Sequence, residues 1–216
     1  MTAKKDYLFN TALDTTATIT AIDRSHDRIS IKLDLTNFHP QGGGQKADLG
    51  TIAGVRVIHV AHDEGDISHY VESAEGLTIG QTVSLNVDPE WRLLNSKLHT
   101  AGHLIAALIE REFPNIQPSA AHHWLGEARV EFTGDNLASP DKITDYLNSA
   151  LCRSIVDNLP INFGGDFQSL RTIQIGLFAA VPCGGTHLQQ LGQLEQICLT
   201  GVKIKKGKLR ISYEVK

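Results

Sequence analysis

Two pairs of potential metal ligands, far apart along the chain, constrain its fold more than any other feature. Each pair is separated by four positions: His99 and His103 form the first, Cys183 and His187 the second. Residues four apart on a helix project from one face, so the two histidines can bind a single ion. Cys183 follows a proline and precedes two glycines, a flexible turn that lets His187 reach the same point. The fold must therefore bring a helix face and a glycine turn together.

Three histidines and one cysteine are a donor set that suits zinc. Imidazole nitrogen and thiolate sulfur are preferred zinc ligands, and four of them satisfy tetrahedral coordination. We therefore predict a zinc site made by His99, His103, Cys183 and His187. All four ligands would close the site, whereas the release of His187 would leave a position for an attacking water, and the spacing fits both. Thr100 stands where a metalloprotease HExxH helix has glutamate, which disfavours that kind of peptidase.

The composition indicates a protein with one large core or two small ones. The chain has 216 residues, of which 41% are hydrophobic. Its three cysteines indicate a reducing compartment, and Cys152 and Cys198 lie at apolar positions where we expect buried thiols. The first residues do not read as a secretory leader, and no apolar segment has spanning length. We expect a soluble, cytoplasmic protein.

The first 88 residues have the pattern of a β domain. Short runs in which β-branched and polar residues alternate are separated by Gly- and Asp-containing turns. The expected strands are residues 16–22, 29–35, 54–60, 68–71 and 81–87, and the first two flank a hairpin turn at residues 23–27. Several short strands of this kind predict a small β-barrel.

The pattern changes at Asp88, which can cap a helix that begins at Pro89. This helix should run to about Phe113, with the two histidines at the edge of its buried stripe. The expected stripe is Leu94, Leu98, Ala101, Ile105 and Leu108. A second helix should run from Ser139 to about Asn158, and strands are expected at residues 128–132, 170–175 and in a C-terminal hairpin. The predicted fold class is α+β, with a β-barrel domain at 1–88 and an α+β domain at 89–216.

Positive charge gathers at the C-terminal end. The net charge is -4, yet residues 201–216 contain six Lys or Arg and one Glu. In the predicted hairpin, with Lys206-Gly207 as its turn, one face packs and the other presents cations. These cations are Lys203, Lys205, Lys208 and Arg210. A partner that carries phosphates would bind there. His122 and His123 fall in an expected loop before Trp124, and we assign them surface or packing roles.

The HTAGH helix and the CGGTH turn, about 80 residues apart, resemble the editing domain of alanyl-tRNA synthetases and their free-standing relatives, the AlaX alanyl-tRNA editing proteins. The segment 38–45, FHPQGGGQ, is similar to a loop of the barrel that precedes the editing domain in those proteins, and Asp48 and Gly50 complete its GGGQxxDxG pattern. The resemblance covers nearly the whole chain, and its three motifs occur in the family's order.

The resemblance implies a zinc-dependent hydrolase that deacylates mischarged tRNA(Ala), chiefly Ser-tRNA(Ala) and also Gly-tRNA(Ala). The two ligand pairs match the family's metal positions, and Gln45 with Gly43 and Gly44 matches the loop that reaches toward the site. The chain is too short to include an aminoacylation domain, so it should act in trans. The tRNA would be contacted at its acceptor end, and the hairpin cations would bind its phosphates.

Discrimination of serine from alanine requires a polar group that pairs with the seryl hydroxyl. Gln45, Thr100 and Thr186 are the candidates for that catalytic-site role. Two departures from the family pattern bear on it: Gln41 replaces the threonine of a TSGGQ loop, and Gly102 stands where synthetases often have threonine. Deacylation of another mischarged tRNA, such as one carrying threonine, therefore stays open. So does a non-catalytic RNA-binding module with a structural zinc.

Overall fold

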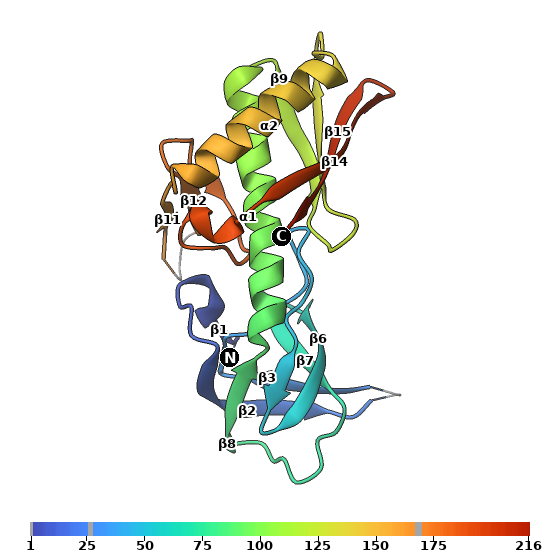
Figure 1. Cartoon of the computed structure of the whole chain (residues 1–216). Coiled ribbons are helices and arrows are strands. Elements are labelled where there is room, and N and C mark those ends of the chain that lie inside the picture. Colours follow the sequence, from blue (N-terminus) through green and yellow to red (C-terminus); the bar gives the residue numbers. More distant parts are fainter. Residues whose placement is uncertain (1, 26–27, 167–169) are drawn as a thin grey trace.

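A computed structural model, which describes residues 2–25, 28–166 and 170–216, shows two parts that meet along one long helix (Figure 1). The described strands before residue 88 include six that pair in the order β2-β3-β7-β6-β5-β8, and β8 pairs with β2 to close the ring. These strands are β2 (Asp14–Asp23), β3 (Ile29–Leu33), β5 (Gly50–Ile52), β6 (Val55–Asp63), β7 (Asp66–Val71) and β8 (Thr82–Val87). Two short strands, β1 (Lys4–Lys5) and β4 (Leu35–Thr36), pair in parallel beside this strand ring. A short 3-10 helix, η1 (Asp6–Leu8), follows β1.

The long helix α1 (Pro89–Glu112) begins and ends where the sequence predicts. The Asp88 side chain accepts hydrogen bonds from the backbone N–H groups of Glu90 and Trp91, and Pro89 occupies the first turn, where it loses no hydrogen bond. Four residues of the predicted stripe are fully buried and Leu94 is partly buried. Figure 1 shows α1 running from the strand ring into the second part of the molecule.

The second part surrounds the far end of α1 with a four-stranded sheet, a second helix and a small three-stranded sheet. The larger sheet has the order β14-β15-β10-β9. Its strands are β9 (Ile116–His122), β10 (Arg129–Gly134), β14 (Ile197–Lys205) and β15 (Lys208–Val215). The remaining elements are α2 (Pro140–Val156), β11 (Ile161–Gly164), β12 (Thr172–Ile175), β13 (Val181–Pro182) and η2 (Leu191–Leu194). The fold is thus mixed α+β, as expected.

Each part has its own apolar core. The core residues inside the strand ring all precede residue 88, whereas those around α1, α2 and the larger sheet all follow residue 94. This separation agrees with the change of pattern seen at Asp88. Among the described residues, no helix combines the length and the apolar character that crossing a membrane would require.

Two expectations are wrong and one lies outside the described residues. Cys152 is exposed, not buried, because it follows Leu151 by about 100° around α2 and so falls off the helix's apolar stripe. Cys198 is half-buried. His122 and His123 do not lie together in a loop, since His122 ends β9, a strand that periodicity missed. The predicted hairpin turn at 23–27 includes residues 26 and 27, outside the described ranges.

Candidate metal centre

The four predicted ligands converge. Their ligand atoms all lie within 4.8 Å of one another, with His99 and His103 supplied by α1 and the other two by the turn after β13. The Sγ atom of Cys183 is 3.5 Å from Nε2 of His99 and 3.1 Å from Nε2 of His187. The centroid of the His103 ring is 5.0 Å from the ring centroids of His99 and of His187. A helix face and a glycine turn thus meet at one point.

The protonation states suit a metal. Burial lowers the pKa of His103 to about 4 and holds the pKa values of His99 and His187 well below their ordinary range, so all three imidazoles are neutral at pH 7. Burial raises the pKa of the Cys183 thiol, and the Gly185 N–H and the Arg171 guanidinium oppose that shift. Neutral imidazole is the form that binds metal, and a thiol releases its proton when it does. The donor set therefore fits a zinc ion.

Gln45, from the strand-ring part, orients His99. Its side-chain oxygen accepts hydrogen bonds from Nδ1 of His99, 2.7 Å away, and from the backbone N–H of Thr186, 2.9 Å away. The side-chain nitrogen of Gln45 donates to Thr186 Oγ1 at 2.9 Å. Because His99 donates through Nδ1, its Nε2 lone pair is left to point at Cys183. Such partners behind a metal ligand fix its tautomer and ring orientation.

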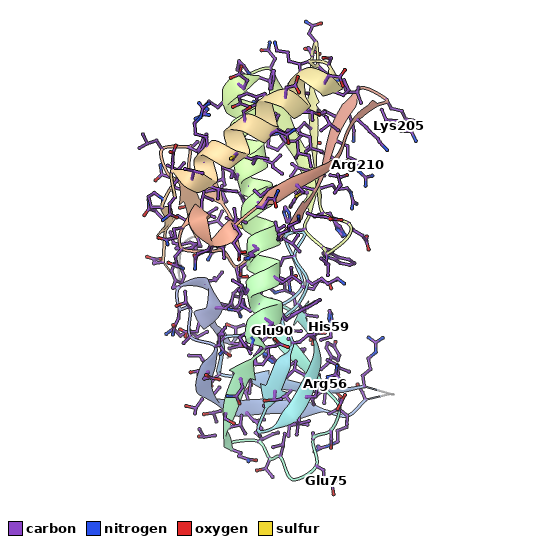
Figure 2. The ribbon with its side chains drawn as sticks, in the orientation of Figure 1. Arg56, His59, Glu75, Glu90, Lys205 and Arg210 are labelled. Carbon is purple, nitrogen blue, oxygen red and sulfur yellow. The ribbon has the colours of Figure 1, made fainter. Side chains whose placement is uncertain are left out.

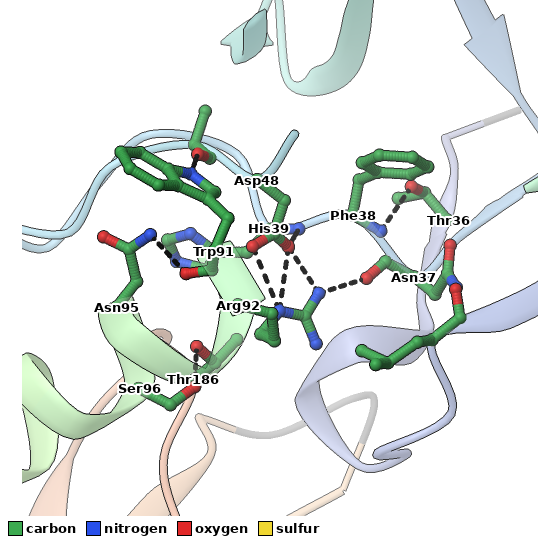
Figure 3. A network of polar contacts seen from close by, with 12 residues as sticks. Thr36, Asn37, Phe38, His39, Asp48, Trp91, Arg92, Asn95, Ser96 and Thr186 are labelled. Carbon is green, nitrogen blue, oxygen red and sulfur yellow. Dashed lines mark hydrogen bonds and ion pairs between the residues drawn. The ribbon is translucent and has the colours of Figure 1, made fainter. Parts of the chain in front are cut away.

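Thr100 orients His187 as Gln45 orients His99. Its hydroxyl lies 3.3 Å from Nδ1 of His187 and accepts the backbone N–H of Leu188 at 3.2 Å. The third candidate, Thr186, pairs with Ser96 at 2.7 Å, as Figure 3 shows. Thr100 and Gln45 are fully buried. The structure thus places all three predicted polar residues beside the cluster. The side chains of Gln45 and Thr100 are engaged with predicted ligands and with backbone, and the Thr186 hydroxyl is engaged with Gln45 and Ser96.

The turn from Cys183 to His187, called the ligand turn below, is held in place by close packing and by one arginine. A Cβ added at Gly185 would overlap the His99 ring, whereas one at Gly184 would meet nothing within 4 Å. Arg171 is buried and donates to the carbonyls of Cys183, at 2.9 Å, and of Gly185, and also to Leu8 O of the strand-ring part at 2.9 Å. Sequence reasoning missed this arginine because its partners are backbone atoms.

The glycine-rich segment is fastened to the start of α1 (Figure 3). The Nε atom of Arg92 lies 3.0 Å from both carboxylate oxygens of Asp48, and Trp91 donates from its indole N–H to Ala47 O at 2.9 Å. The Asp48 carboxylate also accepts the backbone N–H of His39 at 2.6 Å. Asp48 of the GGGQxxDxG pattern therefore sets the loop in place. Gly43 has no such contact, since a Cβ there would meet nothing within 4 Å.

His123, to which the sequence suggested only a surface or packing role, lies at the cluster. Its residue is 3% exposed and its ring stacks on His99, with the centroids 4.4 Å apart. Burial lowers the pKa of His123 to about 3, so the ring is neutral. Nδ1 lies 2.6 Å from the hydroxyl of Tyr213, which donates to Leu98 O at 2.9 Å. No local pattern reveals this position, because the contacts come from distant segments of chain.

A cavity of about 630 Å³ opens beside the cluster. Its lining includes His103, Gly102 and His123 and also Phe178 and Arg111, with the Arg111 guanidinium 4.9 Å from the Phe178 ring centroid. A second cavity of about 620 Å³ is lined in part by His187 and Arg171. Ligand sites in proteins commonly have these volumes.

The basic hairpin forms with the predicted turn, but only the inner part of its apolar face packs, since Leu209, Ile211 and Tyr213 are buried whereas Ile204 is exposed. Lys203 pairs with Arg210 and Lys205 with Lys208 across β14 and β15, and all four side chains are exposed. Positive φ angles at Lys206 and Gly207 make the tight turn. Figure 2 shows Lys205 near the tip of the hairpin and Arg210 further back along it. The inner part of β15 contains Tyr213, which contacts His123, so one strand links the cluster to the basic end.

Comparison with known proteins gives relatives that are named alanyl-tRNA editing proteins or alanine–tRNA ligases, although no protein-family model matches the chain. The alanyl-tRNA editing protein AlaX-M of Pyrococcus horikoshii is 30% identical over 84% of this chain and 85% of its own length. The protein of the same name from Methanosarcina acetivorans is 28% identical over 86% of both. The alanine–tRNA ligase of Nitrosopumilus maritimus is 31% identical, but this chain covers only 23% of it. With most of its length matched to free-standing editing proteins, and with the three motifs assembled at one site, the chain belongs to the AlaX family of alanyl-tRNA editing proteins.

Proposed function

We propose that this protein is a zinc-dependent hydrolase that deacylates mischarged tRNA(Ala) in trans, with Ser-tRNA(Ala) as its main substrate and Gly-tRNA(Ala) as a second. The observation that carries the proposal is the convergence of His99, His103, Cys183 and His187 beside a cavity. The names of the relatives, most of them free-standing editing proteins, support the choice of tRNA.

The protein residues would prepare the site rather than attack the ester. His99, His103, Cys183 and His187 would hold the ion, which supplies a Lewis acid and, where His187 gives up its position, a bound water whose pKa falls to about 7. An aminoacyl ester is already activated, so no protein nucleophile is required. Gln45 and Thr100 keep two ligands in the correct tautomer, and the buried surroundings of the cluster limit bulk water.

We propose a division of labour between residues 1–88 and 89–216. The second part supplies all four ligands, whereas the first supplies the loop that orients one of them. Gly44 gives this loop its close fit, because a Cβ there would press on Ala121 O and on the His123 ring. The loop would therefore shape the wall of the site that faces the aminoacyl group, with Gly43 as its open, exposed member.

The basic hairpin is proposed to bind the acceptor end of the tRNA. Arg210 and Lys208 are three and five residues along β15 from Tyr213, about 10 and 17 Å at the rise of a strand, distances that a few nucleotides can span. Lys203, Lys205, Lys208 and Arg210 would contact phosphates there.

A panel of charged tRNAs tests the proposal. Purified protein, with and without a chelator, is incubated with Ser-tRNA(Ala), Gly-tRNA(Ala), Ala-tRNA(Ala) and a tRNA mischarged with threonine. We expect metal-dependent release of serine and glycine and little release of alanine. Release of threonine alone would show that the substrate is a tRNA mischarged with threonine. No release of any amino acid would overturn the proposal.

A structural metal in a non-catalytic RNA-binding module makes a different prediction. Cys183→Ala would then unfold the protein, because metal binding would supply folding free energy. For a hydrolase we expect a folded variant without activity, which circular dichroism and a thermal melt distinguish.

A further inference from the structure

The polar side chains beside the metal cluster leave the seryl hydroxyl without an obvious partner. Gln45 is occupied by His99 and Thr186, and the Thr186 hydroxyl is shared with Ser96. Thr100 is occupied by His187 and Leu188. Gln41, which replaces the threonine of the family's loop, is exposed and away from these contacts. A protein that recognises serine here must use another group.

One ring nitrogen of His123, Nε2, is available to accept a hydrogen bond from a ligand. Tyr213 donates its hydroxyl hydrogen to Leu98 O, so its oxygen accepts from Nδ1–H of His123. This fixes the tautomer, because a neutral imidazole with its proton on Nδ1 has a lone pair on Nε2. Among the described residues, the hydrogen bonds of this ring involve Nδ1 and leave Nε2 unpaired. Nε2 is therefore an acceptor with fixed orientation.

The position of this acceptor is set by two close contacts. The backbone N–H of His123 donates to Gly44 O at 2.9 Å, so the glycine-rich loop holds its main chain. Its ring fills the space above Gly102, where an added Cβ would overlap it. The absent side chain at Gly102 is what admits the imidazole. His123 and His103 both line the cavity of about 630 Å³.

We propose that His123 is a specificity-determining residue whose Nε2 accepts a hydrogen bond from the hydroxyl of the seryl group, an inference that rests on the proposed deacylase function. An ester carbonyl placed at the cluster has its amino-acid side chain only two bonds away, within reach of the stacked His99–His123 pair. The seryl hydroxyl donates to Nε2, whereas alanyl and glycyl groups have no donor and leave Nε2 unpaired. Such a site favours the hydroxylated substrate over alanine.

The test compares substrates that differ only at the amino acid. In His123→Leu, we expect kcat/KM for Ser-tRNA(Ala) to fall by about tenfold or more, because the buried hydroxyl loses its partner. The value for Gly-tRNA(Ala) should stay nearly unchanged. His123→Gln keeps an acceptor near the Nε2 position and should retain part of the serine preference, and Tyr213→Phe, which frees the tautomer, should lose part of it. His122→Leu is the matched control, since His122 contacts Trp124 and Glu127 instead.

A binding measurement separates recognition from turnover. The affinities of non-hydrolysable seryl-amide and alanyl-amide adenosine are measured for each variant by calorimetry, with metal content determined alongside. We expect His123→Leu to lose the preference for the seryl compound at unchanged metal content. If wild-type protein hydrolyses Ser-tRNA(Ala) and His123→Leu keeps its serine-to-glycine ratio, this inference is wrong and the proposed function stands. If wild-type protein hydrolyses neither, the proposed function itself fails. Should His123→Leu not fold, the ratio in His123→Gln and Tyr213→Phe decides.

Discussion

Arg92, in the first turn of α1, forms a buried ion pair with Asp48 of the glycine-rich segment, and this pair joins the two separately cored parts of the molecule. The guanidinium also donates to Asn37 O at 2.6 Å. The carboxylate is fully buried and the arginine is 8% exposed. Two charges removed from water are tolerated because each is paired and hydrogen-bonded.

Removing one member of that pair should destabilise the protein strongly. Arg92→Leu leaves the Asp48 carboxylate buried and unpaired, which typically costs about 3 to 5 kcal/mol. We expect the free energy of unfolding, measured by urea titration, to fall by that amount. Arg56→Leu is the control, because its pair with Glu72 is exposed and should contribute less than about 1 kcal/mol. Equal losses in the two variants would contradict the assigned role.

Gln45 should influence metal affinity. Gln45→Ala removes the acceptor of the His99 Nδ1 proton, and loss of such a partner typically weakens metal binding by about 10- to 100-fold. Competition with a chromophoric zinc chelator measures this change without any substrate. Gln41→Ala, at an exposed position of the same loop, should bind zinc as the wild type does.

The two glycines of the ligand turn should differ sharply. Gly185→Ala places a Cβ where the His99 ring lies, so we expect loss of metal binding and a lower melting temperature. Gly184→Ala meets nothing within 4 Å and should leave both properties almost unchanged. Zinc content and thermal melts of the two variants, measured side by side, check the packing of the turn.

His69 should make stability depend on pH. Burial in the strand ring lowers its pKa to about 4, and the ring bonds to Thr36 Oγ1 and Ile31 O. An unfolded chain has a histidine pKa of about 6.5, so between pH 6.5 and 4 the unfolded state binds a proton that the folded state does not. Stability contributed by neutral His69 is complete above pH 6.5 and is lost as the pH falls. His69→Gln should lower the pH slope of the unfolding free energy by up to about 1.4 kcal/mol per pH unit in this window. An unchanged slope would refute this assignment.

The hairpin cations should set the salt dependence of tRNA binding. Lys205→Ala with Lys208→Ala should weaken binding and reduce the slope of log K against log salt by about 0.7 to 0.9 for each phosphate that is no longer neutralised. The control, Lys32→Ala with Arg56→Ala, removes the same charge from the strand-ring part. Filter binding at several salt concentrations distinguishes local binding of phosphates from an effect of net charge.

Local patterns were sufficient for the helices and for most strands. Asp88 and Pro89 fix the start of α1 through backbone chemistry within four residues, and the period of its apolar residues fixes the buried face. The four candidate ligands could be predicted from the sequence because each pair is separated by only four positions. The α1 stripe placed His99 at its edge, whereas in the structure His99 is fully buried.

The surroundings of the ligands could not be predicted in the same way. Gln45 and Thr186 are 141 positions apart, and His123 and Tyr213 are 90 apart. Nothing in either local sequence indicates that these partners meet. The sequence also does not show which glycines are needed for packing. At Gly44, Gly102 and Gly185 an added Cβ would overlap atoms of distant segments, whereas at Gly43 and Gly184 it would meet nothing within 4 Å.

The bond from His123 N–H to Gly44 O, with that from His99 to Gln45, means that the loop of the first part contacts both a proposed metal ligand and the residue proposed to recognise the seryl group. The two parts have separate cores but share a single site. A chimera in which residues 1–88 are exchanged for those of a relative would therefore change the surroundings of the metal cluster. It would change the affinity for the ion and the choice of amino acid together, so these two properties are expected to vary as one trait.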